Sequence, residues 1–292
     1  MDKDIIDHVL IDPNIASYEK FFDHDWSKRM FEAVEKSPLR SAVEDLMVAW
    51  RSANGAHILP SLMVQSLKRF AEGEGNGNLR YRENYSGEVI KGIVGKLDSR
   101  MQYSLNLAQR RALKRVVAKI EEEAYRDLMT AQSRVEFPLA GYWNFLVHAP
   151  EFQFSILGTQ RINYGALFFA YEDFLASVIT TKEPTYSSKK KPIKEAFPAH
   201  FGGALADFCW NHDEVTLARL VRNALAHNGG RFGGDLDRYK DRFEDATGTT
   251  NPKLQDDFFI LVDGKIQITP GNTRHLFGVL KERVTKIVEE VA

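Results

Sequence analysis

Arg222-Asn223-Ala224-Leu225-Ala226-His227, followed by Asn228-Gly229-Gly230, is the stretch that decides how the C-terminal part of this chain folds. Apolar residues in and before it recur at the spacing of an amphipathic helix. The two glycines supply the left-handed backbone conformation with which helices commonly end. The stretch therefore predicts a helix over 213–227 that carries an arginine and a histidine near its C-terminus.

The period of an α-helix predicts which of these side chains face the core. The apolar stripe consists of Leu217, Leu220, Val221, Ala224 and Leu225. The opposite, polar face consists of Arg219, Arg222, Asn223, Ala226 and His227. Because Arg222 and His227 lie roughly 140° apart around one helix, a single copy presents them poorly to one phosphate. We therefore expect a site where two copies of helix 213–227 meet.

An arginine and a histidine together suffice to cleave RNA through its own 2′-hydroxyl, without a metal. Histidine exchanges protons near neutral pH, so His227 can act as general base or acid. Arginine stabilises charge on a scissile phosphate, and Asn223 lies one turn before His227, where it can orient the imidazole. The alternative is that Arg222 and His227 only stabilise a helix end, as cations near a C-terminus do.

The spacing Arg222-Asn223-(x)3-His227 resembles the Arg-x4-6-His motif of the HEPN superfamily, in the version with a polar residue directly after the arginine. The aromatic segment 164–176 resembles the long first helix of that family with its acidic residue, here Glu172. The resemblance covers about residues 155–292. It implies an all-α bundle, usually dimeric, and many members are metal-independent endoribonucleases in toxins, defence systems and RNA processing.

The resemblance implies catalytic roles for Arg222, Asn223 and His227, with Glu172 pairing with Arg222 or His227 from the first helix. The expected products are a 2′,3′-cyclic phosphate and a 5′-hydroxyl end. The expected partners are RNA, a second copy that docks through helix 213–227 and, for a toxin, a protein inhibitor or regulator. The alternative is a catalytically inactive HEPN-like module for dimerisation or for nucleotide or RNA binding.

A lysine-rich segment offers further contacts to RNA. Lys189, Lys190 and Lys191 form the most basic short stretch of the chain, within a loop expected over 181–197. We expect these lysines, together with Arg219, to bind the RNA backbone near the site. The alternative is an ordinary polar surface loop.

Composition limits the other classes of function. The 292 residues are 43% hydrophobic and carry a net charge of −1, which argues against a general nucleic-acid coat protein. The single cysteine, the charged N-terminus and the lack of a long apolar run predict a soluble, cytoplasmic protein without a membrane segment. No metal-ligand spacing or phosphate loop stands out, so we expect neither a metal nor a cofactor.

The whole chain reads as mainly helical. We expect an all-α fold with a helical N-terminal domain over 1–150 and a HEPN-like domain over 151–292. The helical pattern breaks at Phe137-Pro138, and the boundary is expected between about 135 and 155. The longest helix is expected over 105–133. Alternating residues over 256–269 around Asp263-Gly264 predict one β-hairpin, and a final helix is expected over 271–291.

Overall fold

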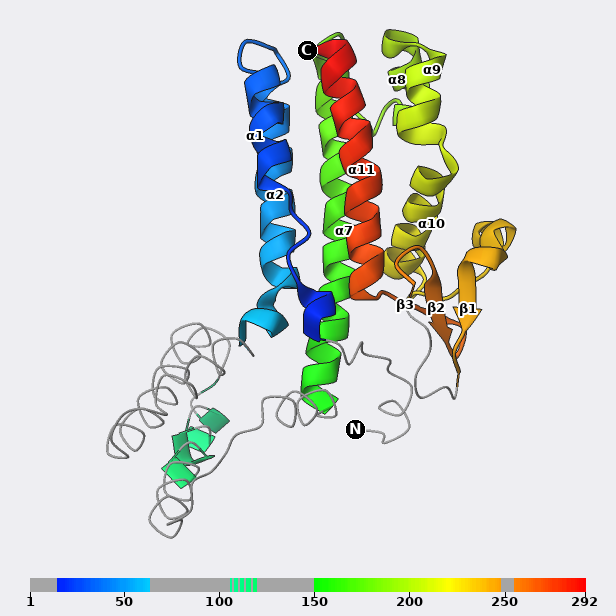
Figure 1. The fold of residues 1–292 in the computed structure, drawn as a ribbon. Coiled ribbons are helices and arrows are strands. Elements are labelled where there is room, and N and C mark those ends of the chain that lie inside the picture. Colours follow the sequence, from blue (N-terminus) through cyan, green and yellow to red (C-terminus); the bar gives the residue numbers. More distant parts are fainter. Residues whose placement is uncertain are drawn as a thin grey trace. The chain divides into compact units, whose positions relative to one another are not determined.

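The fold is mainly helical, with one small three-stranded sheet (Figure 1). It was analysed as a computed structural model that describes residues 15–63, part of 106–119, 150–247 and 255–292. In chain order, the named elements are η2 (Ile15–Tyr18), α1 (His24–Ala33), α2 (Arg40–His57), α7 (Pro150–Thr180), α8 (Ile193–Phe201), α9 (Gly203–Ala206), η3 (Asp207–Asn211), α10 (Asp213–His227), η4 (Gly234–Arg242), β1 (Phe243–Asp245), β2 (Phe259–Val262), β3 (Lys265–Gln267) and α11 (Pro270–Val291).

The long helices α2, α7 and α11 lie side by side and enclose the main core (Figure 1). Three aromatic rings join α1, α2 and α11: Trp26 stacks on Trp50 at 5.9 Å, and Phe277 meets Trp50 edge-on at 5.2 Å. The indole of Trp50 donates a hydrogen bond of 3.1 Å to the carbonyl oxygen of Leu167 on α7. Burial of large aromatic side chains thus fixes the N-terminal helices against the C-terminal ones.

This packing corrects the predicted division at residue 150. Residues 1–63 and 143–292 form one compact unit, and residues 64–142 form a second. The prediction failed because α1 and α2 bury their apolar faces on α7 and α11, which are remote in sequence. Most of the predicted helix 105–133 and the pattern break at Phe137-Pro138 lie outside the described residues.

The predicted hairpin is confirmed, and a further strand extends it. β2 and β3 pair antiparallel around Asp263-Gly264, where both residues adopt positive φ. β1 pairs parallel with the other edge of β2, so the sheet order is β1-β2-β3. Helix α11 then begins with a capping box between Thr269 and Asn272, with proline at its first position. Among the described residues, no helix has the length and apolar character needed to cross a membrane.

Candidate functional site

Helix α10 has the bounds expected from the sequence, but its buried face is wider than predicted. The Arg222 side chain lies inside the protein, and the residue is 8% exposed. Leu220, which was expected in the core, is only half-buried. Because α7 runs alongside α10, the helix buries Arg222 together with Val221. The prediction that Arg222 faces solvent is therefore wrong.

The buried Arg222 guanidinium has three neighbours on α7. Its Nη2 donates a hydrogen bond to Oε2 of Glu172, and the two groups form an ion pair. Its central carbon lies 4.4 Å from the ring centroid of Phe169 and 5.3 Å from that of Phe168. The expected contact between Glu172 and the motif arginine is thus present, with the cation held over two aromatic rings.

Burial sets the electrostatics of this pair. Removal from water raises the pKa of the Glu172 carboxyl above its usual range, and the Arg222 charge opposes that rise. The Arg222 Nε is buried and has no hydrogen-bond partner among the described residues. Only about a tenth of the Arg222 side chain remains exposed. The guanidinium is therefore held between α7 and α10, and little of the Arg222 side chain is open to solvent.

Unlike the buried Arg222, His227 is exposed, in the last turn of α10. The next residues turn the chain sharply: Gly229 and Gly230 have φ of +62° and +81°. The Gly230 amide returns to the Ala224 carbonyl with a hydrogen bond of 2.8 Å. Asn223 is half-buried, and no hydrogen bond joins it to His227 within the described part of the chain. His227 thus points to solvent while Arg222 points to α7.

An exposed apolar line runs along α7 beside these residues. Ile162 is 70% exposed and Phe169 is 48% exposed, and Ala166 lies between them at helical spacing. Phe169 is also the ring beneath the Arg222 guanidinium. The apolar line therefore adjoins the motif directly and continues along the outer surface of α7.

The remaining predicted RNA contacts do not gather at His227. Lys189 and Lys190 are exposed in the turn that follows α7, and Lys191 lies 3.9 Å from Glu183. This turn is at the far end of α7 from the C-terminus of α10 (Figure 1). The expectation that the three lysines lie near the site is wrong, because α7 and α10 run antiparallel.

Arg219 is half-buried rather than free on a polar face. Its guanidinium carbon lies 4.6 Å from the ring centroid of Trp210, and burial lowers its pKa. The ring supports the cation from one side, and Glu172 contributes a favourable charge. Arg219 therefore extends the cationic lining of α10 toward its N-terminal half.

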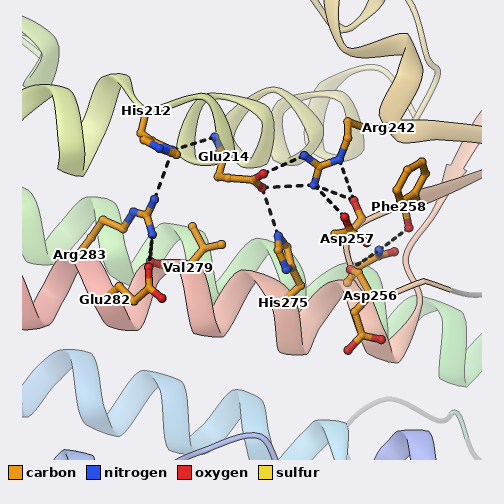
Figure 2. Close-up of polar contacts among 11 residues, drawn as sticks. His212, Glu214, Arg242, Asp256, Asp257, Phe258, His275, Val279, Glu282 and Arg283 are labelled. Carbon is orange, nitrogen blue, oxygen red and sulfur yellow. Dashed lines mark hydrogen bonds and ion pairs between the residues drawn. The ribbon is translucent and has the colours of Figure 1, made fainter.

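A second polar cluster, not expected from the sequence, ties the start of α10 to the end of η4, to the segment before β2 and to α11 (Figure 2). Glu214 accepts hydrogen bonds of 2.8 and 3.4 Å from Arg242, and its Oε2 lies 3.2 Å from His275 Nε2. Arg242 also donates to the Asp257 carbonyl oxygen at 2.9 Å. These partners lower the pKa of Glu214 to about 2, with the His275 hydrogen bond the largest cause.

The cluster of Glu214, Arg242 and His275 joins elements that are distant in sequence, so no local motif could have revealed it. The cluster adjoins the start of α10, whose N-cap is His212. The His212 Nδ1 accepts from the Glu214 amide at 3.3 Å and lies 3.2 Å from Nη2 of Arg283 on α11. This cluster fixes the position of α10, which carries the motif at its other end.

Comparison with protein-family models, with curated proteins and with solved structures finds no match to this chain. Within the described ranges, no group of three or more histidine, cysteine or acidic side chains is arranged to hold a metal ion.

Proposed function

We propose that this chain is a metal-independent endoribonuclease of the HEPN type that works as a homodimer. His227 acts as general base on the 2′-hydroxyl or as general acid on the leaving 5′-oxygen. Arg222 stabilises the charge that develops on the scissile phosphate. Asn223 orients His227 or the phosphate, and Glu172 holds Arg222 in place.

The observation that carries this proposal is the Glu172–Arg222 ion pair. It joins an acid of the long aromatic helix to the motif arginine, the contact that the resemblance implies. A buried ion pair restricts the guanidinium to one orientation, and we expect substrate to reach it from an edge that Glu172 and the two aromatic rings do not cover. We expect a phosphate oxygen to bind at that edge, where the surrounding low dielectric strengthens the interaction.

Arg222 and His227 point in different directions in one copy of the chain, and a dimer could bring the two residue types together. In one copy the arginine faces α7 and the histidine faces solvent. A two-fold axis near the end of α10 would place His227 of one protomer close to the motif of its partner. The exposed apolar line of Ile162, Ala166 and Phe169 supports such an interface, because a contiguous exposed apolar surface favours association.

We place the nuclease in the reducing cytoplasm, because its single cysteine, Cys209, is free and buried. We further place it in a defence or toxin–antitoxin setting, in which a partner protein restrains cleavage. These two assignments follow from the proposed chemistry and are tested only after cleavage is established.

A second candidate function is a non-catalytic module that binds RNA or dimerises. The burial of Arg222 favours it, because an arginine already neutralised by Glu172 is less available to substrate. In this alternative the ion pair stabilises the fold, and His227 contributes only surface charge. The two candidates differ in whether wild-type protein breaks the RNA chain.

The discriminating experiment is incubation of purified protein with single-stranded RNA in excess EDTA. If the chain is a nuclease, wild type should cleave the RNA. His227→Ala should lower the cleavage rate at least about a hundredfold, since one acid–base group contributes about that much. DNA of the same sequence should stay intact. His200→Ala, which removes a remote histidine paired with Glu183, is the matched control and should cleave normally. RNA that remains intact with wild type would favour the non-catalytic module.

A further inference from the structure

Three cations gather around the turn that ends α10, and none of them belongs to the motif. Arg161 lies on α7, Arg231 follows the terminal glycines, and Lys265 opens β3. Within the described part of the chain, no ion pair or side-chain hydrogen bond engages any of the three. They place three positive charges around one turn of a molecule whose net charge is −1.

Gly230 precedes Arg231 in sequence and contacts the segments that carry the other two residues. A Cβ atom placed on Gly230 would lie 2.8 Å from a guanidinium nitrogen of Arg161, so the glycine makes room for that group. The carbonyl oxygen of Gly230 accepts a hydrogen bond of 2.8 Å from the Ile266 amide. That contact places the start of β3 against the end of α10, with His227 three residues before Gly230 along the chain.

Arg231 and Lys265 are direct cross-strand partners in an antiparallel bridge. Such partners project from the same face of a ladder, with Cβ atoms about 5 Å apart, and like charges at that spacing repel one another. Both side chains are exposed. An anion bound between them would relieve the repulsion.

We propose that Arg161, Arg231 and Lys265 form a phosphate-binding surface that positions the RNA backbone next to His227. The inference rests on the proposed function for the substrate, but its evidence is independent of the Arg222–Glu172 pair. The guanidinium groups suit bidentate binding to phosphate, and the lysine supplies a point charge. These are positioning residues, which hold the nucleotides flanking the scissile one across the end of α10 and the β2–β3 hairpin.

The test measures binding apart from cleavage. A short single-stranded oligoribonucleotide in its 2′-O-methyl form cannot be cut through a 2′-hydroxyl, so its affinity for the full chain reports positioning alone. Arg161→Ala, Arg231→Ala and Lys265→Ala should each weaken binding several-fold. Each should also lower the slope of log K against log salt by about 0.7, the contribution of one phosphate contact in a single strand.

Lys28→Ala is the matched control, because Lys28 is an exposed cation on α1 and its removal should change neither affinity nor slope. Poly-glutamate serves as a second polyanion and should compete poorly, since it lacks phosphate. Unchanged salt slopes in all three variants, or poly-glutamate competing as well as RNA, would overturn the inference.

The outcomes separate this surface from the proposed chemistry. If wild type cleaves RNA and the three variants bind as wild type does, the proposed phosphate-binding surface is rejected and the proposed nuclease is supported. If binding depends on the three cations and ordinary RNA is not cleaved, the phosphate-binding surface is supported and the nuclease is rejected. In that second case the chain is an RNA-binding module.

Discussion

Arg222 of α10 and Glu172 of α7 form a buried ion pair that fixes the motif arginine to the long central helix. The pair lies beside the exposed apolar line of α7, and the Arg222 guanidinium covers the ring of Phe169. Arg222 therefore has a structural role whatever its chemical role. An experiment that removes Arg222 must separate the two.

Loss of Arg222 should destabilise the protein. Arg222→Ala leaves the Glu172 carboxylate partly buried without its partner, which typically costs about 2–4 kcal/mol. His227→Ala should change the free energy of unfolding by less than about 1 kcal/mol, because His227 is exposed. Urea denaturation of both variants measures the difference. The double variant Glu172→Gln with Arg222→Met should regain part of the loss, and equal stabilities for all variants would contradict the buried pair.

Self-association should depend on the apolar line of α7. Ile162→Asp places a charge on a surface that the proposed dimer buries, so sedimentation should show a shift from dimer to monomer at micromolar concentration. Val48→Asp is the matched control, because Val48 is also an exposed branched residue, 66% exposed, on α2. A wild-type monomer with full activity, or dissociation by Val48→Asp alone, would argue against this interface.

A buried histidine should make stability depend on pH. His57 lies between Gln160 at 3.1 Å and the ring of Phe21, and burial lowers its pKa from 6.5 to about 4. The unfolded chain therefore takes up a proton at higher pH than the folded protein. Stability should fall as pH decreases from 6.5 toward 4, by up to about 3 kcal/mol. His57→Gln should lose this component in denaturation series across that range, and an unchanged pH profile would show that His57 is not its source.

The Glu214 cluster should act in a lower pH range. Its partners hold the pKa of Glu214 near 2, below the ordinary 4.5, so its stabilisation is complete above pH 4.5 and is lost as pH falls toward 2. Glu214→Gln should be less stable than wild type at neutral pH, with a difference that shrinks through this window. Glu195→Gln, on α8, is a control acid with no partner among the described residues. A stability difference that stays constant down to pH 2 would be inconsistent with the cluster.

Sequence patterns within a few residues predicted the helix bounds and the hairpin correctly. The bounds of α10, the β2–β3 hairpin and the last helix follow from helical periodicity, a glycine stop and a two-residue turn. The contact between Glu172 and Arg222 was expected only from a family resemblance. The helix bounds and the hairpin depend on residues close in sequence, whereas the Glu172–Arg222 contact joins two helices that are 50 residues apart.

The predictions that were wrong concern features set by contacts between residues distant in sequence. A helical wheel assigned Arg222 to solvent because it cannot include α7, which packs on the same side. The domain division failed because α2 and α7, separated by many residues, share one core. Arg161 and Lys265 reach the end of α10 only through the antiparallel course of α7 and the hairpin, so their grouping has no signature in sequence.

The most direct test of the proposed chemistry replaces one 2′-hydroxyl. A cleavage site is first mapped on a short RNA in EDTA, and the same RNA is then made with a single 2′-deoxy nucleotide on the 5′ side of that bond. Wild type should cut the all-ribose strand to a 2′,3′-cyclic phosphate and a 5′-hydroxyl end, and cutting at the substituted bond should disappear. Equal cutting of the 2′-deoxy strand would contradict the mechanism. So would cleavage of the all-ribose strand that occurs without EDTA and stops when EDTA is added.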